Sequence, residues 1–103
     1  MLLFGTMADK PFARMLARLA PLASHRVFAT PGGRAPAPVA ELAAAAPGEA
    51  VGAPAAAFER AVELARGASA GGRPRIVVTG SLYLVGELRS RLLGLDCDPI
   101  VPL

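Results

Sequence analysis

The segment over residues 76–94, IVVTGSLYLVGELRSRLLG, restricts the possible folds of this chain more than any other part of the sequence. Residues 75–79 form a short β-branched apolar run, as expected of a strand that is buried on both faces. Gly80 interrupts this run, and Ser81 is suited to cap a helix that follows. The apolar residues of that helix recur at spacings of three and four, at Leu84, Val85, Leu88 and Leu92. The sequence therefore predicts a strand, a turn and a helix in direct succession.

The start of this predicted helix is a candidate anion site. A helix that opens after a buried parallel strand presents free backbone N–H groups and the positive end of its dipole. The hydroxyls of Thr79, Ser81 and Tyr83 cluster around this point. Gly80 leaves the backbone room to turn, and Gly86 favours close packing of the helix. We therefore expect an anion to bind at the carboxyl end of this strand.

The rest of the chain alternates between strand and helix signals. Strands are expected over residues 2–6 and 25–30, and a very short edge strand over residues 50–51. Asp9 and Pro11 open a helix that ends or kinks at Pro21 and has one apolar face, made of Phe12, Met15, Leu16 and Leu19. Two more helices are expected, over residues 36–46 and over residues 55–66 up to Gly67, followed by a loop over residues 68–74.

This alternation predicts an α/β fold. We expect a Rossmann-like, three-layer α-β-α arrangement around a mostly parallel sheet of about four strands, with right-handed crossovers. The domain should span residues 1–94, and the tail over residues 95–103, with its two prolines, should be irregular or a short extra edge strand.

Composition excludes several classes of function. The net charge is +3, but the basic residues are scattered and no basic run is interleaved with aromatic residues, which argues against a nucleic-acid partner. The single cysteine, Cys97, excludes an internal disulfide framework and suits a reducing cytoplasm. The N-terminus lacks the features of a signal peptide, and no apolar stretch approaches ~20 residues, so no membrane span is expected.

Two sequence motifs resemble one protein family. Residues 78–89, VTGSLYLVGELR, closely resemble the closing motif of bacterial folylpolyglutamate synthase/dihydrofolate synthase, a member of the Mur ligase superfamily. Residues 2–10, LLFGTMADK, followed by Phe12, resemble that family's strand ending in G-x-[ML]-A-D-K-D. The order and spacing of the two motifs also fit. The chain as a whole resembles the Mur ligase C-terminal-like domain of this family.

The resemblance implies a role in ligation. Such enzymes use ATP and magnesium to phosphorylate a carboxylate of a folate, which the amine of L-glutamate then attacks. An N-terminal ATPase domain carries the glycine-rich phosphate loop and the metal ligands, and the smaller C-terminal domain helps hold the amino acid. This sequence contains no G-x-x-x-x-G-K-[ST] motif, and its only lysine, Lys10, lies in no glycine-rich loop.

We therefore expect the glutamate-binding C-terminal portion of a ligase, not catalytic alone. No catalytic residue, metal ligand or cofactor is assigned to this chain. ATP and Mg belong to the complete enzyme, whose partners are L-glutamate, a folate and the ATPase domain, in cis or in trans.

The sequence departs from the family at its start. The family domain opens with a strand leading to D-G-A-H-N, which is absent here, and His25, followed by Arg-Val-Phe, does not match the histidine of that motif. In a doubly wound sheet the first strand is usually central. We expect its absence to leave neighbouring strands with unpaired edges and an uncovered apolar face.

The resemblance and the predicted topology together indicate the site residues. Lys10 is expected to pair with a carboxylate of glutamate or with the acyl phosphate. Ser81 either holds a carboxylate or only caps the helix, and Tyr83 either lines the same pocket or packs in the core. Asp9 is expected to cap a helix and orient Lys10. Thr79 and Gly80 support the site, and Gly5 and Thr6 end a strand on the same rim.

Two other functions remain open at this point. The chain could be a non-catalytic α/β module that binds a small anion at the Gly80–Ser81 turn or a partner protein through a sheet edge. It could also be a degenerate fragment without function. An upstream coding frame with the phosphate loop and D-G-A-H-N would favour the ligase.

Overall fold

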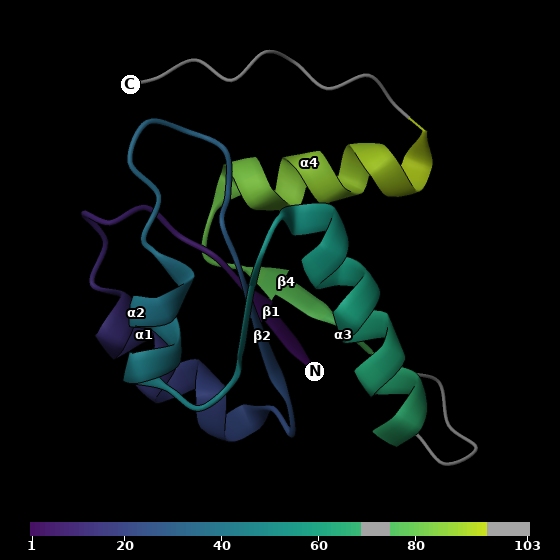
Figure 1. Ribbon diagram of the computed structural model, residues 1–103, viewed down its shortest axis with the longest axis horizontal. Coiled ribbons are helices and arrows are strands. Elements are labelled where there is room, and N and C mark those ends of the chain that lie inside the picture. Colours follow the sequence, from purple (N-terminus) through teal and green to yellow (C-terminus); the bar gives the residue numbers. More distant parts are fainter. Residues whose placement is uncertain (69–74, 95–103) are drawn as a thin grey trace.

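The computed structural model describes residues 1–68 and 75–94 and contains one four-stranded parallel sheet. Its strands are β1 (Leu2–Phe4), β2 (Arg26–Ala29), β3 (Glu49–Gly52) and β4 (Val77–Thr79), in the spatial order β3-β2-β1-β4. All three pairings are parallel, and β1 contacts β2 on one side and β4 on the other (Figure 1). The predicted α/β fold with a parallel sheet is confirmed.

Helices cover both faces of this sheet, which gives the three layers of a Rossmann-like fold. They are α1 (Phe12–Leu19) with the 3-10 turn η1 (Ala20–Leu22), α2 (Val39–Ala45), α3 (Pro54–Ala68) and α4 (Leu82–Leu93). The first two α-helices pack on one face and the last two on the other (Figure 1). No helix that the structure describes is long and apolar enough to cross a membrane.

The two-residue repeat of the strands divides the core into two clusters. On one face, Leu2, Phe4 and Phe28 pack against Leu16 of α1 and Leu42 of α2. On the other face, the buried residues are Leu3, Val27, Ala29, Ala57, Ala61, Leu84 and Leu88. The expected apolar face of α1 is confirmed, since Leu16 is buried and its neighbours pack around it. Packed helices thus cover both faces of the sheet and fix the positions of the strand ends, where a site could form.

The limits of three helices differ from expectation. Helix α2 begins at Val39 and not at Pro36, because Pro36 forms a β-bridge with Met7. Helix α3 continues through Gly67 to Ala68, and Gly67 is not among the glycines with the positive φ that often ends a helix. Helix α1 begins only at Phe12 with Pro11 at its N-cap and no capping side chain. Asp9 therefore does not cap α1, because the backbone turns first: the Lys10 N–H donates to the Met7 carbonyl and the Phe12 N–H to the Lys10 carbonyl.

The prediction that residues 75–79 form a strand buried on both faces is wrong. Among the strands that the structure describes, β4 lies at the edge of the sheet, and the side chain of Val77 is 59% exposed. Leu92 of α4, expected in the core, is 62% exposed, and Gly86 makes no close helix contact, because a Cβ atom there would meet nothing within 4 Å. The open edge of β4 therefore leaves an apolar side chain uncovered. The sheet itself is continuous, however, with β1 in its interior, so the hydrogen bonding between the described strands needs no further central strand.

Of the expected loop over residues 68–74, Ala68 is the last residue of α3, and residues 69–74 lie outside the described residues, as do the tail over residues 95–103 and Cys97.

Candidate functional site

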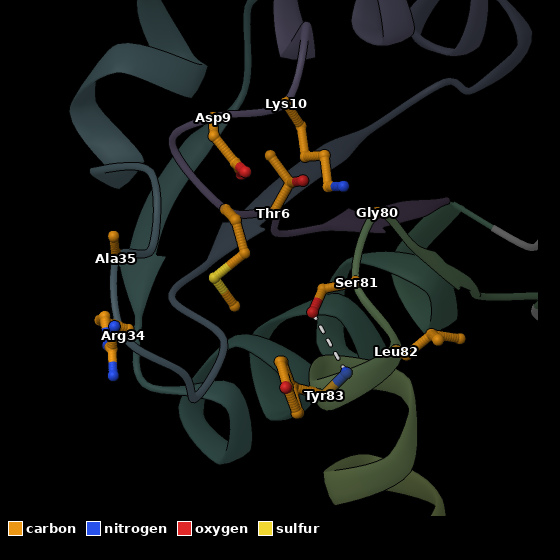
Figure 2. Close-up of a pocket in the computed structure, with 10 residues that line it drawn as sticks. Thr6, Asp9, Lys10, Arg34, Ala35, Gly80, Ser81, Leu82 and Tyr83 are labelled. Carbon is orange, nitrogen blue, oxygen red and sulfur yellow. Dashed lines mark hydrogen bonds between the residues drawn. The ribbon is translucent and has the colours of Figure 1, made fainter. Parts of the chain in front are cut away.

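The loops that follow β1, β2 and β4 meet at the carboxyl edge of the sheet and enclose a pocket of about 620 Å³. Figure 2 shows side chains from these three segments around it. The lining residues are Thr6, Met7, Asp9, Lys10, Arg34, Ala35, Gly80, Ser81, Leu82 and Tyr83. In open α/β sheets this edge is the usual place for ligands, so we name these residues the rim pocket.

The wall contributed by β4 and α4 is built as the sequence predicted. Gly80 has φ +104°, in the left-handed region that side chains other than glycine rarely adopt. The Ser81 Oγ accepts hydrogen bonds from the Tyr83 N–H at 3.2 Å and from the Leu84 N–H at 3.4 Å, which makes Ser81 the N-cap of α4. The capping role of Ser81 is confirmed, and the positive end of the twelve-residue α4 faces the rim pocket.

The opposite wall consists of two loops that are hydrogen-bonded to each other. The Ala8 N–H donates to the Ala35 carbonyl at 2.8 Å, and the Ala37 N–H donates to the Thr6 carbonyl at 2.8 Å. These bonds flank an isolated antiparallel bridge between Met7 and Pro36. These bonds therefore fix the position of the loop that carries Lys10 relative to the loop that carries Arg34.

Gly33 brings the second of these loops close to Met7 on the first loop and to Tyr83 on the wall formed by α4. Its φ is +124°, and a Cβ atom on it would lie 2.6 Å from the Met7 Cε and 3.5 Å from the Tyr83 Cδ2. The half-buried Tyr83 ring thus stands beside the glycine turn that follows β2 and lines the rim pocket. Of the two roles considered for Tyr83, the structure supports the pocket wall.

The rim pocket carries a positive charge excess. Lys10 and Arg34 are both exposed, and Asp9 is the single carboxylate among the lining residues. Among the described residues, neither cation forms an ion pair, and Asp9 forms none with Lys10, so the expected orienting contact is absent there. Two exposed cations beside a helix N-terminus favour an anionic ligand.

Thr6 contributes a buried hydroxyl to this pocket. The residue is 0% exposed and follows β1 directly. Its Oγ1 has no hydrogen-bond partner among the described residues, the only buried side-chain polar atom in that part of the chain for which this holds. Such groups are rare in folded proteins, because desolvation without a partner is costly.

The structure brings together most of the residues that the sequence indicated. Lys10, Ser81 and Tyr83 line the rim pocket, as do Asp9 and Gly80. Thr79 does not line it: this residue pairs with Phe4 in the sheet, and its carbonyl accepts the Gly5 N–H at 3.3 Å.

Sequence reasoning missed Arg34 and Met7. A signal for Arg34 existed, because it stands in the PGGR turn just after a predicted strand, and parallel strands end at the same edge. No comparable signal marks Met7, whose position depends on contact between two loops.

The rim pocket does not fit a magnesium nucleotide. Asp9 is its single carboxylate, and its single lysine lies in a turn without a glycine-rich loop. Over residues 1–68 and 75–94, no three or more His, Cys, Asp or Glu residues gather into a candidate metal site. The charges that line the rim pocket suit the binding of an anionic group.

A second polar cluster lies at the other end of the sheet, where β2 and β3 begin. The Arg60 guanidinium donates to both carboxylate oxygens of Glu49, at 2.7 and 2.9 Å, and to Glu63 at 3.0 Å. These hydrogen bonds hold the pKa of Glu49 below its usual value and raise that of Arg60. Nearby, Arg26 donates to the carbonyls of Ala20, Ala23 and Pro47. This cluster ties α3 to β3 and does not contribute to the rim pocket.

In comparisons with known proteins, no family model, no curated protein and no solved structure matches this chain.

Proposed function

We propose that this chain is the glutamate-binding C-terminal portion of an ATP-dependent folate:L-glutamate ligase and is not catalytic alone. The proposal is carried by one observation: the two segments that resemble the family, residues 2–10 and 78–89, contribute Lys10 and Ser81 to one pocket. These segments are distant in sequence and adjacent in space because β1 pairs with β4. A shared pocket is what a common ligand requires.

The chemistry of the rim pocket fits an amino acid with two carboxylates. Lys10 and the N-terminus of α4 would hold one carboxylate, and Arg34 on the opposite loop is available for the other. Held in this way, the amino group of glutamate could be presented to the activated carboxylate of the folate. Activation, which consumes ATP, belongs to the ATPase domain, so ATP, Mg and the folate are assigned there. The complete enzyme would act in the cytoplasm.

Binding and reconstitution test this proposal in two steps. The ¹⁵N-labelled chain is titrated with L-glutamate, with D-glutamate and L-glutamine as controls for stereochemistry and for the second carboxylate. Saturable amide shifts at Thr6, Lys10, Arg34 and Ser81 with L-glutamate alone are expected. The chain is then added to the ATPase domain of a folate:glutamate ligase whose own C-terminal domain has been removed. Restored, glutamate-dependent release of ADP is expected, and no rescue together with no glutamate binding would refute the proposal.

A second candidate is a non-catalytic module that binds small anions. The observation in its favour is the positive charge of the rim pocket, which does not depend on the resemblance to any family. This candidate predicts binding of phosphate and simple carboxylates without preference for L-glutamate and no rescue of the ATPase domain.

A further inference from the structure

The Thr6 hydroxyl is the feature of the rim pocket that the proposed function leaves without a role. Its Oγ1 is fully buried and has no partner among the described residues. The Thr6 backbone is, by contrast, well held, since its carbonyl accepts the Ala37 N–H at 2.8 Å. Leaving a buried hydroxyl unpaired destabilises a fold, whereas valine has the same shape without that penalty. A polar group kept at such a cost indicates a partner outside the described residues, and a bound ligand is one such partner.

The surroundings of Thr6 determine what kind of partner fits. In Figure 2 the hydroxyl points toward the end of the Lys10 side chain, with Ser81 at the start of α4 in the same view. A lysine ammonium and helix N–H groups are all hydrogen-bond donors. A hydroxyl among donors is best satisfied when it donates its own hydrogen to an acceptor that the others also bind. An oxyanion, the oxygen-rich end of a carboxylate or phosphate, is such an acceptor.

We propose that Thr6 Oγ1 donates a hydrogen bond to an oxyanion of the ligand and, with Lys10 and the N-terminus of α4, forms a three-sided oxyanion site. Thr6 fixes the depth of the anion, Lys10 supplies the opposite charge, and the start of α4 supplies the positive end of the helix dipole. The identity of the oxyanion, an amino-acid carboxylate or a phosphate, rests on the proposed function, and the hydrogen bond from Thr6 does not.

Three variants isolate the hydroxyl. Thr6→Val removes it at constant shape, Thr6→Ser retains it without the methyl group, and Thr6→Ala removes it without requiring space. Thr30→Val is the matched control, because Thr30 follows β2 and is not among the residues that line the rim pocket. For each form, the dissociation constants of inorganic phosphate and of L-glutamate are measured by amide shifts, and the melting temperature is measured without ligand.

The expected pattern separates binding from folding. Thr6→Val and Thr6→Ala should bind the oxyanion roughly tenfold or more weakly than the wild type, since a hydrogen bond to a charged group is lost. The melting temperature of Thr6→Val should stay equal or rise, because an unpaired buried hydroxyl has been removed. Thr6→Ser should bind within about threefold of the wild type, and Thr30→Val should bind unchanged. Wild-type affinity in Thr6→Val and Thr6→Ala, or failure of the wild type to bind either probe, would overturn the inference.

The two probes also keep this inference distinct from the proposed function. If phosphate binds through Thr6 and L-glutamate does not bind, the oxyanion site stands and the glutamate-binding function fails. If L-glutamate binds equally well to Thr6→Val, the proposed function stands and the role of Thr6 fails.

Discussion

A Cβ atom on Gly80 would clash with the backbone oxygen of Gly5, so the ends of β4 and β1 can meet only because position 80 has no side chain. Gly80 also has φ +104°. The lack of space for a side chain and the positive φ both favour glycine at position 80, in the turn that positions Ser81 and the start of α4. The close approach of these two strand ends therefore brings α4 against the loop that carries Lys10.

We predict that Gly80→Ala destabilises the protein by at least about 2 kcal/mol, because backbone strain and a clash with a main-chain oxygen act together. Urea unfolding followed by circular dichroism measures this change. Gly86→Ala is the matched control: its Cβ would meet nothing within 4 Å inside α4, and it should stabilise by up to about 1 kcal/mol. Equal stability of Gly80→Ala and the wild type would contradict this description of the turn.

Lys10→Ala should weaken L-glutamate binding roughly tenfold to a hundredfold, because a charge-assisted hydrogen bond is lost. Lys10→Arg should recover little, since a planar guanidinium does not replace a compact ammonium. The exposed Arg14 of α1, outside the rim pocket, provides the control Arg14→Ala, which should bind normally. Titration calorimetry measures these affinities. An unchanged affinity in Lys10→Ala would show that Lys10 is a solvated loop residue that does not bind the ligand.

Ser81→Ala should have two separable effects. Loss of the two hydrogen bonds that cap α4 should cost about 1 kcal/mol of stability. If the start of α4 also binds the ligand, affinity should fall even where the variant remains fully folded. Thermal unfolding and glutamate titration at a temperature well below the transition distinguish these effects. A stability loss with unchanged affinity would mean that Ser81 is a cap alone.

The Glu49–Arg60 pair predicts a specific dependence of stability on pH. Hydrogen bonds from Arg60 lower the pKa of Glu49 in the folded state relative to 4.5. Stability from this pair is therefore present above the unfolded pKa and is lost as pH falls through the folded pKa. Arg60→Met should be less stable than the wild type near neutral pH, and the difference should shrink below about pH 4.5. Urea unfolding across this range measures the difference, and Arg66→Met, on the same helix without an ion pair among the described residues, should show no such convergence.

The open edge of β4 predicts self-association of the isolated chain. Val77 is 59% exposed on this edge strand, and charged side chains on edge strands oppose pairing between molecules. Val77→Lys should raise the dissociation constant of any self-associated form by about tenfold or more. Sedimentation equilibrium measures it, with Leu22→Lys, an 84% exposed site away from the sheet, as control. Equal self-association of Val77→Lys and the wild type would exclude the edge of β4 as the surface through which the chains associate.

Local sequence signals predicted the elements and the turn after β4. The short VTGS segment predicts Ser81 as the cap of α4, and the β-branched run over residues 75–79 predicts β4, because these preferences act over a few residues. Lys10, Ser81 and Tyr83 could be indicated together because parallel strands share one carboxyl edge. Asp9 was assigned wrongly as a cap, since a backbone turn intervenes before Phe12.

The sequence by itself determined the alternation of strands and helices, the α4 cap and the polar residues that follow the strands. Only the tertiary structure decided that β4 is an edge strand, that Arg34 joins the rim pocket and that the Thr6 hydroxyl is buried without a partner in the described chain. Periodicity and capping depend on neighbouring residues. Strand order, loop pairing and burial depend instead on contacts between segments far apart in the chain, which no local pattern encodes.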